Sequence, residues 1–443
     1  MKREDIFRNL LVAAFIAAMV FQFTTGVEAA SGDLDPTFGS GGKVVTQTGY
    51  DDKIKAIAIQ LDGKIVVVGR RDAFYPYQGG LIARYNADGS LDQSFGVGGF
   101  VTDAAHGGHT TYFNAVAIQT DGKIVAAGYF FESGGCMRDQ SWVVRYNADG
   151  SRDTTFGGDG EVEYPYLYVN GCPVDSYHFG VAVQNNGRIV VAGASENSAG
   201  NLDFAAARLN ANGTLDTSFN LDGLATISIG TSTDVANAVR IQPVTGKILL
   251  AGYSYNSATG NDFALVMLNS NGLYDLSFGN FGKVTTDTGW DDRINSVALS
   301  GSNIVAAGTQ SNSANGVDFS LARFNSTNGI LDTTFDGDGK VKTAFGAYYD
   351  IAFGVAIQSD GKIVAAGYGR GWSDTSYNFA ISRYNTNGSL DTTFNVDGKQ
   401  TTDFSGYADY GTAVAIQPDG KILVAGYAWN GLDYDIALAR YLP

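Results

Sequence analysis

Arginine and aspartate recur at fixed places in this chain, and such side chains can either bind a ligand or pair with each other. The repeated arginines are Arg84, Arg145, Arg208, Arg323, Arg383 and Arg440. The repeated aspartates, one in each L-D-x-x-F phrase, are Asp35, Asp92, Asp153, Asp216, Asp275, Asp332 and Asp391. A planar guanidinium suits close pairing with a carboxylate, so we expect structural Arg–Asp pairs rather than ligand-binding rings of charge. In the fourth unit Met267 replaces the arginine, so Asp275 should lack that partner.

Aromatic residues stand beside carboxylates in segments that vary between the repeated units. Aromatic rings stack on the apolar faces of sugars, carboxylates accept hydrogen bonds from hydroxyls, and Tyr and Trp are enriched in protein interfaces. The alternative is that many of these rings pack in the core, which aromatic side chains fill well. The tentative ligand-binding residues are Tyr50, Asp51, Asp52, Trp290, Asp291, Asp292, Tyr349, Trp372, Tyr407 and Trp429.

Cysteine and histidine are scarce. Cys136 and Cys172 are the only cysteines, and they fall in the two longest insertions beside one repeated unit. An even pair in an exported protein is typical of a disulfide. His106, His109 and His178 are expected in consecutive loops of one face, but they have no spacing that defines a metal site. We therefore predict a disulfide, no metal and no cofactor.

A sequence repeat carries these residues. The phrase A-I-Q-x-D-G-K-I-V-x-A-G recurs along the chain and is followed by L-D-x-T-F. A repeat of about sixty residues is a supersecondary unit that buries its apolar face only by stacking on copies of itself. Its seven markers are Phe38, Phe95, Phe156, Phe219, Phe278, Phe335 and Phe394.

Four short runs rich in Val, Ile and Ala recur in each unit and predict four strands, a to d. In the first complete unit they span Ala56–Gln60, Lys64–Gly69, Gly80–Asn86 and Gly99–Thr102. Asp62-Gly63 joins a to b, and a two-residue Asp-Gly link is a strong hairpin signal. The a–b and c–d links should lie on one face of the fold, and the variable b–c and d–a links on the other. The chain is expected to be all-β, with one four-stranded propeller blade per unit.

The two ends of the repeat complement each other. The last unit supplies strands a to c at Thr412–Gln417, Lys421–Gly426 and Ile436–Tyr441, and it stops before strand d. The missing half stands near the start, as the phrase containing Phe38 followed by residues 43–46. A linear solenoid would need atypical capping repeats instead. We predict a single seven-bladed β-propeller that the N-terminal strand closes by joining the C-terminal blade.

The phrases A-I-Q-x-D-G-K-I-V-x-A-G and L-D-T-T-F resemble those of the delta-60 repeat proteins, bacterial proteins whose unit has about sixty residues. The resemblance covers essentially the whole chain after residue 30. It implies a secreted or surface-associated β-propeller, and it implies no activity because the shared residues form the framework.

Residues 1–29 lie before the repeat and are typical of a secretory signal peptide. Lys2 and Arg3 give a basic start, Leu10–Phe21 is apolar, and Val27–Ala29 offers a small-x-small cleavage pattern. The apolar run is shorter than the roughly 20 residues that a membrane span needs, although an uncleaved anchor is the alternative. We predict a signal peptide at 1–29, a propeller at 30–443, and a secreted, periplasmic or surface-associated monomer without a membrane span after cleavage.

The net charge of −16 argues against nucleic acids and anionic membranes as partners, because both select basic patches. Our main hypothesis is a non-catalytic binding propeller that presents one variable face to a saccharide or a protein. The rival is a polysaccharide hydrolase or lyase with paired carboxylates on that face, which would need to lie roughly 5–10 Å apart. A structural cell-surface or adhesion component is a third possibility.

Overall fold

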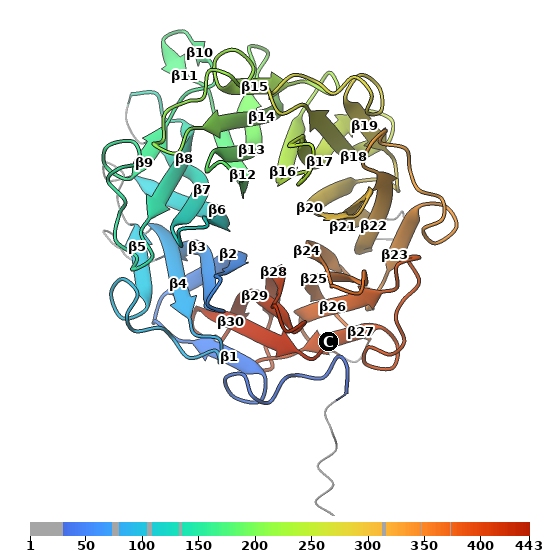
Figure 1. Cartoon of the computed structure of the whole chain (residues 1–443). Coiled ribbons are helices and arrows are strands. Elements are labelled where there is room, and N and C mark those ends of the chain that lie inside the picture. Colours follow the sequence, from blue (N-terminus) through green and yellow to red (C-terminus); the bar gives the residue numbers. More distant parts are fainter. Residues whose placement is uncertain are drawn as a thin grey trace, which may run out of the picture. The chain divides into compact units, whose positions relative to one another are not determined.

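Seven four-stranded antiparallel sheets make up residues 31–443, and each sheet is one blade (Figure 1). The predicted all-β, seven-bladed propeller is confirmed. This computed structural model describes residues 30–72, 79–103, 109–132, 135–311, 316–346, 348–372 and 374–443. The predicted signal segment and His106 lie outside the described residues. No helix in the described part of the chain has the length and apolar character of a membrane span.

Blades 1 to 4 each follow the chain from strand a to strand d. Blade 1 contains β2 (Asp51–Ile59), β3 (Ile65–Asp72), β4 (Gly79–Tyr85) and β5 (Phe100–Asp103). Blade 2 contains β6 (Thr110–Ile118), β7 (Ile124–Phe131), β8 (Asp139–Tyr146) and β9 (Glu161–Glu163). Blade 3 contains β12 (Ser176–Val183), β13 (Ile189–Glu196), β14 (Leu202–Leu209) and β15 (Leu224–Ile227). Blade 4 contains β16 (Asp234–Ile241), β17 (Ile248–Asn256), β18 (Gly260–Leu268) and β19 (Lys283–Thr286).

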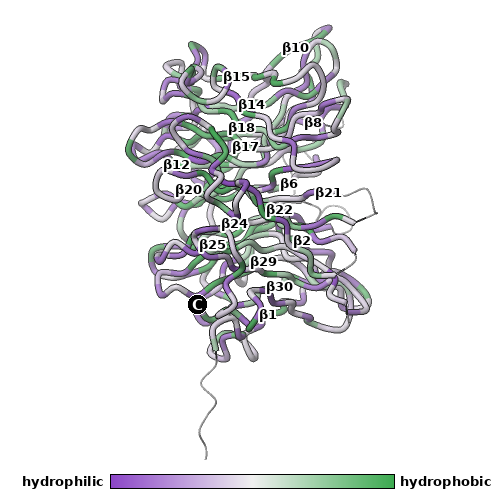
Figure 2. The backbone as a smooth tube through the Cα atoms, turned by 90° about the vertical axis from the view of Figure 1, so that its right-hand side faces the viewer, coloured by the Kyte–Doolittle hydropathy of each residue, from purple (hydrophilic) through white to green (hydrophobic). Residues whose placement is uncertain are grey.

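Blades 5 to 7 complete the ring. Blade 5 contains β20 (Asp292–Ser300), β21 (Asn303–Ser311), β22 (Val317–Asn325) and β23 (Lys340–Thr343). Blade 6 contains β24 (Ile351–Ile357), β25 (Ile363–Gly369), β26 (Asn378–Tyr384) and β27 (Lys399–Thr402). Blade 7 contains β28 (Asp409–Ile416), β29 (Ile422–Trp429), β30 (Tyr434–Tyr441) and β1 (Lys43–Thr46). A separate hairpin pairs β10 (Tyr168–Val169) with β11 (Cys172–Pro173). The strands carry the hydrophobic segments of the chain, and the links between them are mostly hydrophilic (Figure 2).

The N-terminal strand closes the ring as predicted. Strand β1 pairs antiparallel with β30, and Lys43 faces Ala439 while Thr46 faces Ile436 (Figure 1). Phe38 is fully buried in a cluster with residues of blades 1 and 7. Hydrogen bonding and apolar packing therefore both hold the two ends of the chain together.

A β-bulge interrupts strand a of every blade. The register with strand b shifts at the same place in all seven blades. A bulge adds one residue and reverses the alternation of buried and exposed side chains beyond it. The bulged residues are Lys55, Asn114, Phe179, Asn237, Asn295, Phe353 and Thr412.

Bulged side chains also join neighbouring blades near the axis. The Asn237 side-chain amide donates to the Ile294 carbonyl at 2.8 Å, and the Thr412 hydroxyl donates to the Ile54 carbonyl at 2.8 Å. The glycine that ends the K-I-V-x-A-G phrase lies against the same bulge. A Cβ on Gly128 would overlap the Tyr112 carbonyl oxygen, which explains why every unit has glycine there.

The structure contains the six expected Arg–Asp pairs, with Nε to Oδ2 distances of 2.7–2.8 Å. In the pair of Arg84 and Asp92, both residues are buried, and the Arg84 guanidinium lies over the Phe95 ring at 4.5 Å. The same guanidinium donates to the Ala148 carbonyl of the next blade. Each pair thus fixes the c–d turn of its own blade and binds the neighbouring blade.

Most of these aspartates have a second cationic partner that the sequence analysis missed. Lys64 Nζ lies 2.9 Å from Asp92, and equivalent Lys or Arg residues approach most of the other aspartates. Asp275 lacks an arginine as expected, but Lys247 Nζ binds it at 2.6 Å, so the carboxylate is not unpaired. Beside it Met267 is fully buried.

A second repeated position lies at the start of strand a, and it is an aspartate in every blade except blades 2 and 3, which have Thr111 and Ser176. The side chains at this position are fully buried in all seven blades, namely Asp52, Thr111, Ser176, Asp234, Asp292, Asp350 and Asp409. Several of the carboxylates accept hydrogen bonds from backbone amides of the preceding turn, for example from Phe345 to Asp350 at 2.7 Å. Burial raises the pKa of Asp292 to about 6 and the pKa of Asp409 to about 7.

Removing β1 tests ring closure. A chain that begins at Gly49 lacks the β1–β30 ladder, the buried Phe38 and the Asp35 partner of Arg440. Leaving a buried charge without its partner costs about 3–5 kcal/mol by itself. We expect the melting temperature to fall by many degrees, or the chain to aggregate through the exposed edge of β30. Thermal unfolding of this chain beside one beginning at Ala30 makes the measurement, and equal melting temperatures would refute closure.

The Arg–Asp pairs predict a loss of stability in acid. Although burial raises the pKa of Asp35, hydrogen bonds from Thr37 and Lys421 lower it from 3.8 to about 2. Because the folded pKa is below the unfolded one, the stabilisation is present above about pH 4 and is lost as the pH falls to about 2. Asp35→Asn should lower the unfolding free energy at neutral pH by about 3–5 kcal/mol and should flatten its fall in acid.

Urea unfolding between pH 2 and 7 measures this effect. The control is Asp360→Asn, because Asp360 caps an a–b turn in which another unit has Asn186 with an equivalent hydrogen bond. A wild-type acid slope in Asp35→Asn would contradict the prediction.

Candidate functional site: the channel mouth

The seven strands a surround a narrow axial channel. Its lining includes the bulged residues and encloses a cavity of about 170 Å³. The lining includes Asn114, Asn237 and Asn295 together with Phe179 and Phe353. The channel lining therefore combines polar amides with aromatic rings.

A larger pocket of about 500 Å³ adjoins the channel at blades 7, 1, 2 and 3. It lies at the start of strands a and the end of strands b, and so on the side of the variable b–c and d–a links. Its lining combines three cations with aromatic rings and has no carboxylate among the described residues. The lining residues are Lys53, Lys55, Arg70, Tyr112, Phe113, Asn114, Tyr129, Phe179 and Tyr427.

Tyrosines line much of this mouth because one repeated cross-strand pair faces the axis in each blade. In blade 1 the pair is Lys53 and Arg70, in blade 2 it is Tyr112 and Tyr129, and in blade 7 it is Tyr410 and Tyr427. The Tyr112 and Tyr129 rings stack with centroids 4.8 Å apart. These tyrosines are half-buried, so each is held in place and still presents part of its ring.

The tyrosines stay protonated at neutral pH. Burial, with smaller contributions from neighbouring charges and rings, raises the pKa of Tyr129 to about 12. Burial likewise raises the pKa of Tyr427. Both hydroxyls can therefore donate hydrogen bonds, and their rings offer faces on which a sugar can stack.

The three cations are held in different ways. Asp72 binds Lys53 at 3.2 Å and Arg70 at 3.0 Å, and these partly exposed pairs orient the two side chains without removing them from the pocket. Arg70 also lies over the Tyr112 ring at 5.4 Å. Among the described residues, no carboxylate lies within ion-pair distance of Lys55. The Lys55 side chain stays exposed within the channel, but desolvation by the surrounding wall, with repulsion from Arg70 and Lys53, lowers its pKa.

Such a pocket can bind an anion attached to a ring. The cations supply charge-assisted hydrogen bonds to a carboxylate or sulfate, and the tyrosines supply stacking surfaces and hydroxyl donors. A ligand anion would also give Lys55 a partner of opposite charge.

The predicted ligand-binding aromatics lie around this face, but the pocket does not bring them together. Tyr50, Trp290, Tyr349, Trp372 and Tyr407 are exposed, and Trp372 is the most exposed of them at 83%. Trp429 is half-buried and packs on Tyr434 with ring centroids 4.8 Å apart. None of these residues lines the mouth pocket.

The predicted carboxylates divide into exposed and buried groups. Asp291 is exposed and binds Arg293 at 3.2 Å, while Asp51 is half-buried and accepts a hydrogen bond from the Tyr434 amide at 2.9 Å. Placing Asp52 and Asp292 in exposed loops was wrong, because both lie in strands with fully buried side chains. Strand a starts several residues earlier than its pattern suggested, because the bulge breaks the alternation. Neither buried carboxylate can contact a saccharide.

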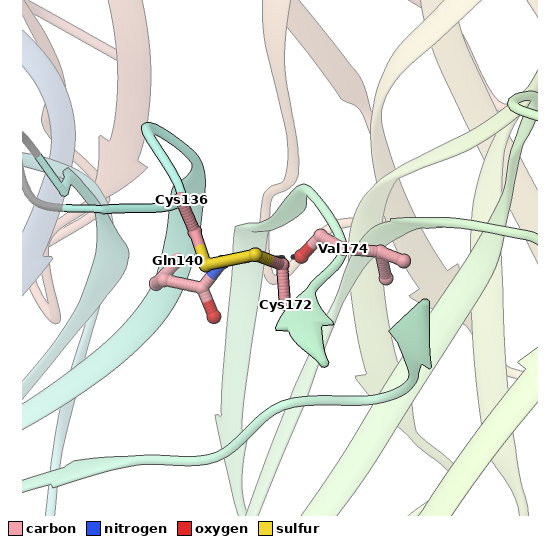
Figure 3. The surroundings of a disulfide bond; sticks show 4 residues. All are labelled: Cys136, Gln140, Cys172 and Val174. Carbon is pink, nitrogen blue, oxygen red and sulfur yellow. Dashed lines mark hydrogen bonds between the residues drawn. A yellow bond between two sulfur atoms is a disulfide. The ribbon is translucent and has the colours of Figure 1, made fainter. Parts of the chain in front are cut away.

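The predicted disulfide is present and braces the loops beside blade 2 (Figure 3). Cys136 bonds to Cys172 of β11, and their Cα atoms are 5.7 Å apart. Close by, the Gln140 side-chain amide donates to the Val174 carbonyl at 3.1 Å. A disulfide indicates an oxidising environment.

One predicted histidine position was wrong. His178 lies in β12 rather than in a loop, and its side chain is fully buried. Its Nε2 atom is 3.3 Å from the hydroxyls of both Tyr164 and Tyr166. Burial lowers the pKa of His178 to about 3, so the ring is neutral at physiological pH. His109 comes directly before β6.

One family model matches the chain in every repeat. It is described as a domain of unknown function (DUF5122) beta-propeller, and it matches residues 60–95, 119–156, 184–219, 245–278, 303–335, 358–394 and 417–443. These segments carry the a–b turn, strands b and c, and the Arg–Asp–Phe cluster, and they leave out the strand a residues that line the mouth. No curated protein sequence matches the chain.

Several solved structures are similar to the chain at low identity and low TM-score. Polysaccharide lyase Uly1 is 12% identical, with 94% of this chain and 93% of that chain covered and a TM-score of 0.47. The α-L-arabinofuranosidase Arb93A from Fusarium graminearum is 10% identical, with 74% and 92% covered and a TM-score of 0.41. Hadza microbial sialidase Hz136 is 10% identical, with 72% and 63% covered and a TM-score of 0.41. Values this low carry no inference about activity.

Removing the disulfide should loosen one side of the variable face. In Cys136→Ser/Cys172→Ser, the 36-residue separation between the cysteines predicts a loss of about 2–4 kcal/mol. Because the bond joins two surface loops, we expect earlier protease cleavage within residues 135–175 and an intact ring. Limited proteolysis with mass spectrometry makes the measurement. Unchanged cleavage in the double variant would show that the bond does not brace these loops.

Proposed function

We propose a binding function at the channel mouth for this chain, which belongs to the DUF5122 beta-propeller family. The segments that the family model matches include Arg70, Tyr129 and Tyr427 of the mouth pocket, but they leave out its strand a residues, such as Lys53, Lys55 and Tyr112. The proposed ligand is an acidic saccharide, such as a chain that contains uronic acid. The protein acts outside the cytoplasm, after its N-terminal segment has directed export. The disulfide supports export, and so does the resemblance to the secreted delta-60 repeat proteins.

One observation carries this proposal. Lys53, Lys55 and Arg70 gather in a single tyrosine-lined pocket of a chain whose net charge is −16. Like charges repel, so a cluster of cations without enough carboxylate partners is costly unless an anion joins it. The half-buried Tyr112, Tyr129 and Tyr427 suit the ring faces of a sugar. The exposed aromatics around the face, including Trp290 and Trp372, could contact a longer chain beyond the pocket.

An enzyme is the second candidate. A hydrolase with paired carboxylates is not favoured at the mouth, since the described lining of this pocket has no carboxylate. The lowered pKa of Lys55 is the observation that favours catalysis, because an amine that loses its proton more easily can act as a base. A lyase would place such a base beside cations that neutralise the uronate carboxylate. Unsaturated product released from a polyuronate would support this candidate.

Binding of matched saccharides tests the proposal. Oligouronates should bind in calorimetry, neutral oligosaccharides of equal length should bind much more weakly, and added salt should weaken the uronate binding. Lys53→Gln/Arg70→Gln should lower affinity by roughly tenfold or more, since a hydrogen bond to a charged group contributes about 1.5–3 kcal/mol. Tyr129→Ala should lower affinity through lost stacking.

Arg293→Gln is the matched control. Arg293 occupies the position of Lys53 in blade 5, but it does not line the mouth pocket. It should leave affinity unchanged. Equal binding of neutral and acidic sugars, or an equal loss in Arg293→Gln, would contradict the proposed site.

A further inference from the structure

Three carboxylates meet where blade 4 joins blade 5. Asp262 belongs to β18, Asp292 begins β20, and Asp287 lies in the turn that joins the two blades. One oxygen from each lies within 4.8 Å of the other two. Asp262 is 6% exposed, Asp292 is fully buried, and Asp287 is exposed to solvent. The cluster therefore opens to solvent on one side only.

Each buried carboxylate leaves one oxygen unused. Asp262 Oδ2 accepts hydrogen bonds from the Asn256 amide at 3.2 Å and the Thr259 hydroxyl at 3.0 Å, and Asp292 Oδ2 accepts one from the Thr288 backbone amide at 2.6 Å. The Oδ1 atoms of Asp262 and Asp292 are buried without a hydrogen-bond partner. A buried charged oxygen in this state is costly, because it has lost its hydration and gained nothing in return.

Some other blade junctions reduce the charge at these two positions from within the chain, but the junction of blades 3 and 4 does not, because Asp203 and Asp234 there also leave their Oδ1 atoms without a hydrogen-bond partner. Between blades 7 and 1, Arg71 binds the buried Asp52 at 2.8 Å. Between blades 5 and 6, Lys342 Nζ binds Asp318 at 2.6 Å. Between blades 6 and 7, the strand c position is the neutral Asn378. Neither the junction of blades 3 and 4 nor the junction of blades 4 and 5 has an arginine, a lysine or a neutral strand c residue of this kind in the described part of the chain.

Over the ranges that the structure describes, only the junction of blades 4 and 5 adds a third carboxylate, Asp287, to such a pair. Among the described residues, no Lys, Arg or His lies within 4 Å of the carboxylate of Asp262, Asp287 or Asp292. Lys340 reaches this turn, but its Nζ donates to the Asp287 carbonyl at 2.6 Å rather than to a carboxylate. Three acids that share one small space without a basic partner are stabilised by a positive charge from outside the chain, either a cation or a proton.

We propose that Asp262, Asp287 and Asp292 bind a divalent cation of the calcium type, which joins blade 4 to blade 5. All the donors are oxygens, which hard cations prefer, and no histidine or cysteine belongs to the cluster. The Thr288 hydroxyl, buried without a hydrogen-bond partner, is a further oxygen next to Asp287. Water on the open side completes the coordination of a calcium ion, which takes six to eight oxygens.

Calcium binding and stability test this site in the whole protein. After treatment with chelator, calcium chloride should raise the melting temperature, while sodium chloride of equal ionic strength should not, because only an ion that binds the folded state stabilises it. Calorimetry should give one strong site per chain. Terbium should bind in place of calcium and emit when Trp290 is excited, since Trp290 lies two residues before Asp292.

Two variants separate this site from general attraction to an acidic protein. Asp287→Asn changes an exposed ligand and should fold normally, yet it should weaken calcium binding by roughly tenfold or more, since affinity follows the number of charged ligands. Asp121→Asn removes one charge from an a–b turn where another unit has Asn186, and it should bind calcium as the wild type does.

Two results would overturn the proposal. One is calcium affinity and terbium emission in Asp287→Asn equal to those of the wild type. The other is a melting temperature that calcium leaves unchanged while Asp292→Asn raises it, because the two buried acids would then share a proton instead of a metal.

Discussion

In every blade except blade 4, the contact of one arginine with one aspartate and one phenylalanine holds the blade to the next. Arg440 makes all of these contacts, because it binds Asp35 at 2.8 Å, lies over Phe38 at 4.5 Å and donates to the Ala87 carbonyl of blade 1. Asp35 and Phe38 come from the start of the chain, so this contact repeats an ordinary blade junction across the closure. The ring therefore closes with the same interactions that build it, and the N-terminal strand needs no separate anchor.

Much of this framework could be predicted from sequence because it recurs in every unit. Pairing of β1 with β30 followed from the missing strand d, and the Arg84–Asp92 type of pair followed from two residues at fixed places. Repetition, however, did not predict which residue would neutralise an aspartate whose arginine partner is missing. Asp275 lacks the arginine and pairs with Lys247 instead. This lysine lies in the a–b link of blade 4, and only folding brings it near the c–d turn that carries Asp275.

The candidate site was harder to predict because a bulge hides it. Lys55 occupies the bulge of blade 1, and the alternation of side chains reverses there. The residues before it therefore looked like a loop, although Lys53 faces the axis and Asp52 is buried in the strand. Tyr112 and Tyr129 are distant in sequence from Lys53, and the pocket depends on blades that lie side by side only after folding. The repeated strand a position was the one signal that could have revealed it.

The distribution of charge on the propeller differs between the positions that repeat in every blade and the positions where a single blade differs from the others. The repeated aspartates of the c–d turns are each paired by cations of their own blade, so they leave little unpaired negative charge at these turns. Unbalanced charge remains where a single blade departs from the pattern. At the mouth, Lys53, Lys55 and Arg70 of blade 1 give a local excess of positive charge. At the junction of blades 4 and 5, three aspartates give the opposite excess. Because a rigid ring cannot move these groups apart, each excess favours an ion of opposite charge from solution.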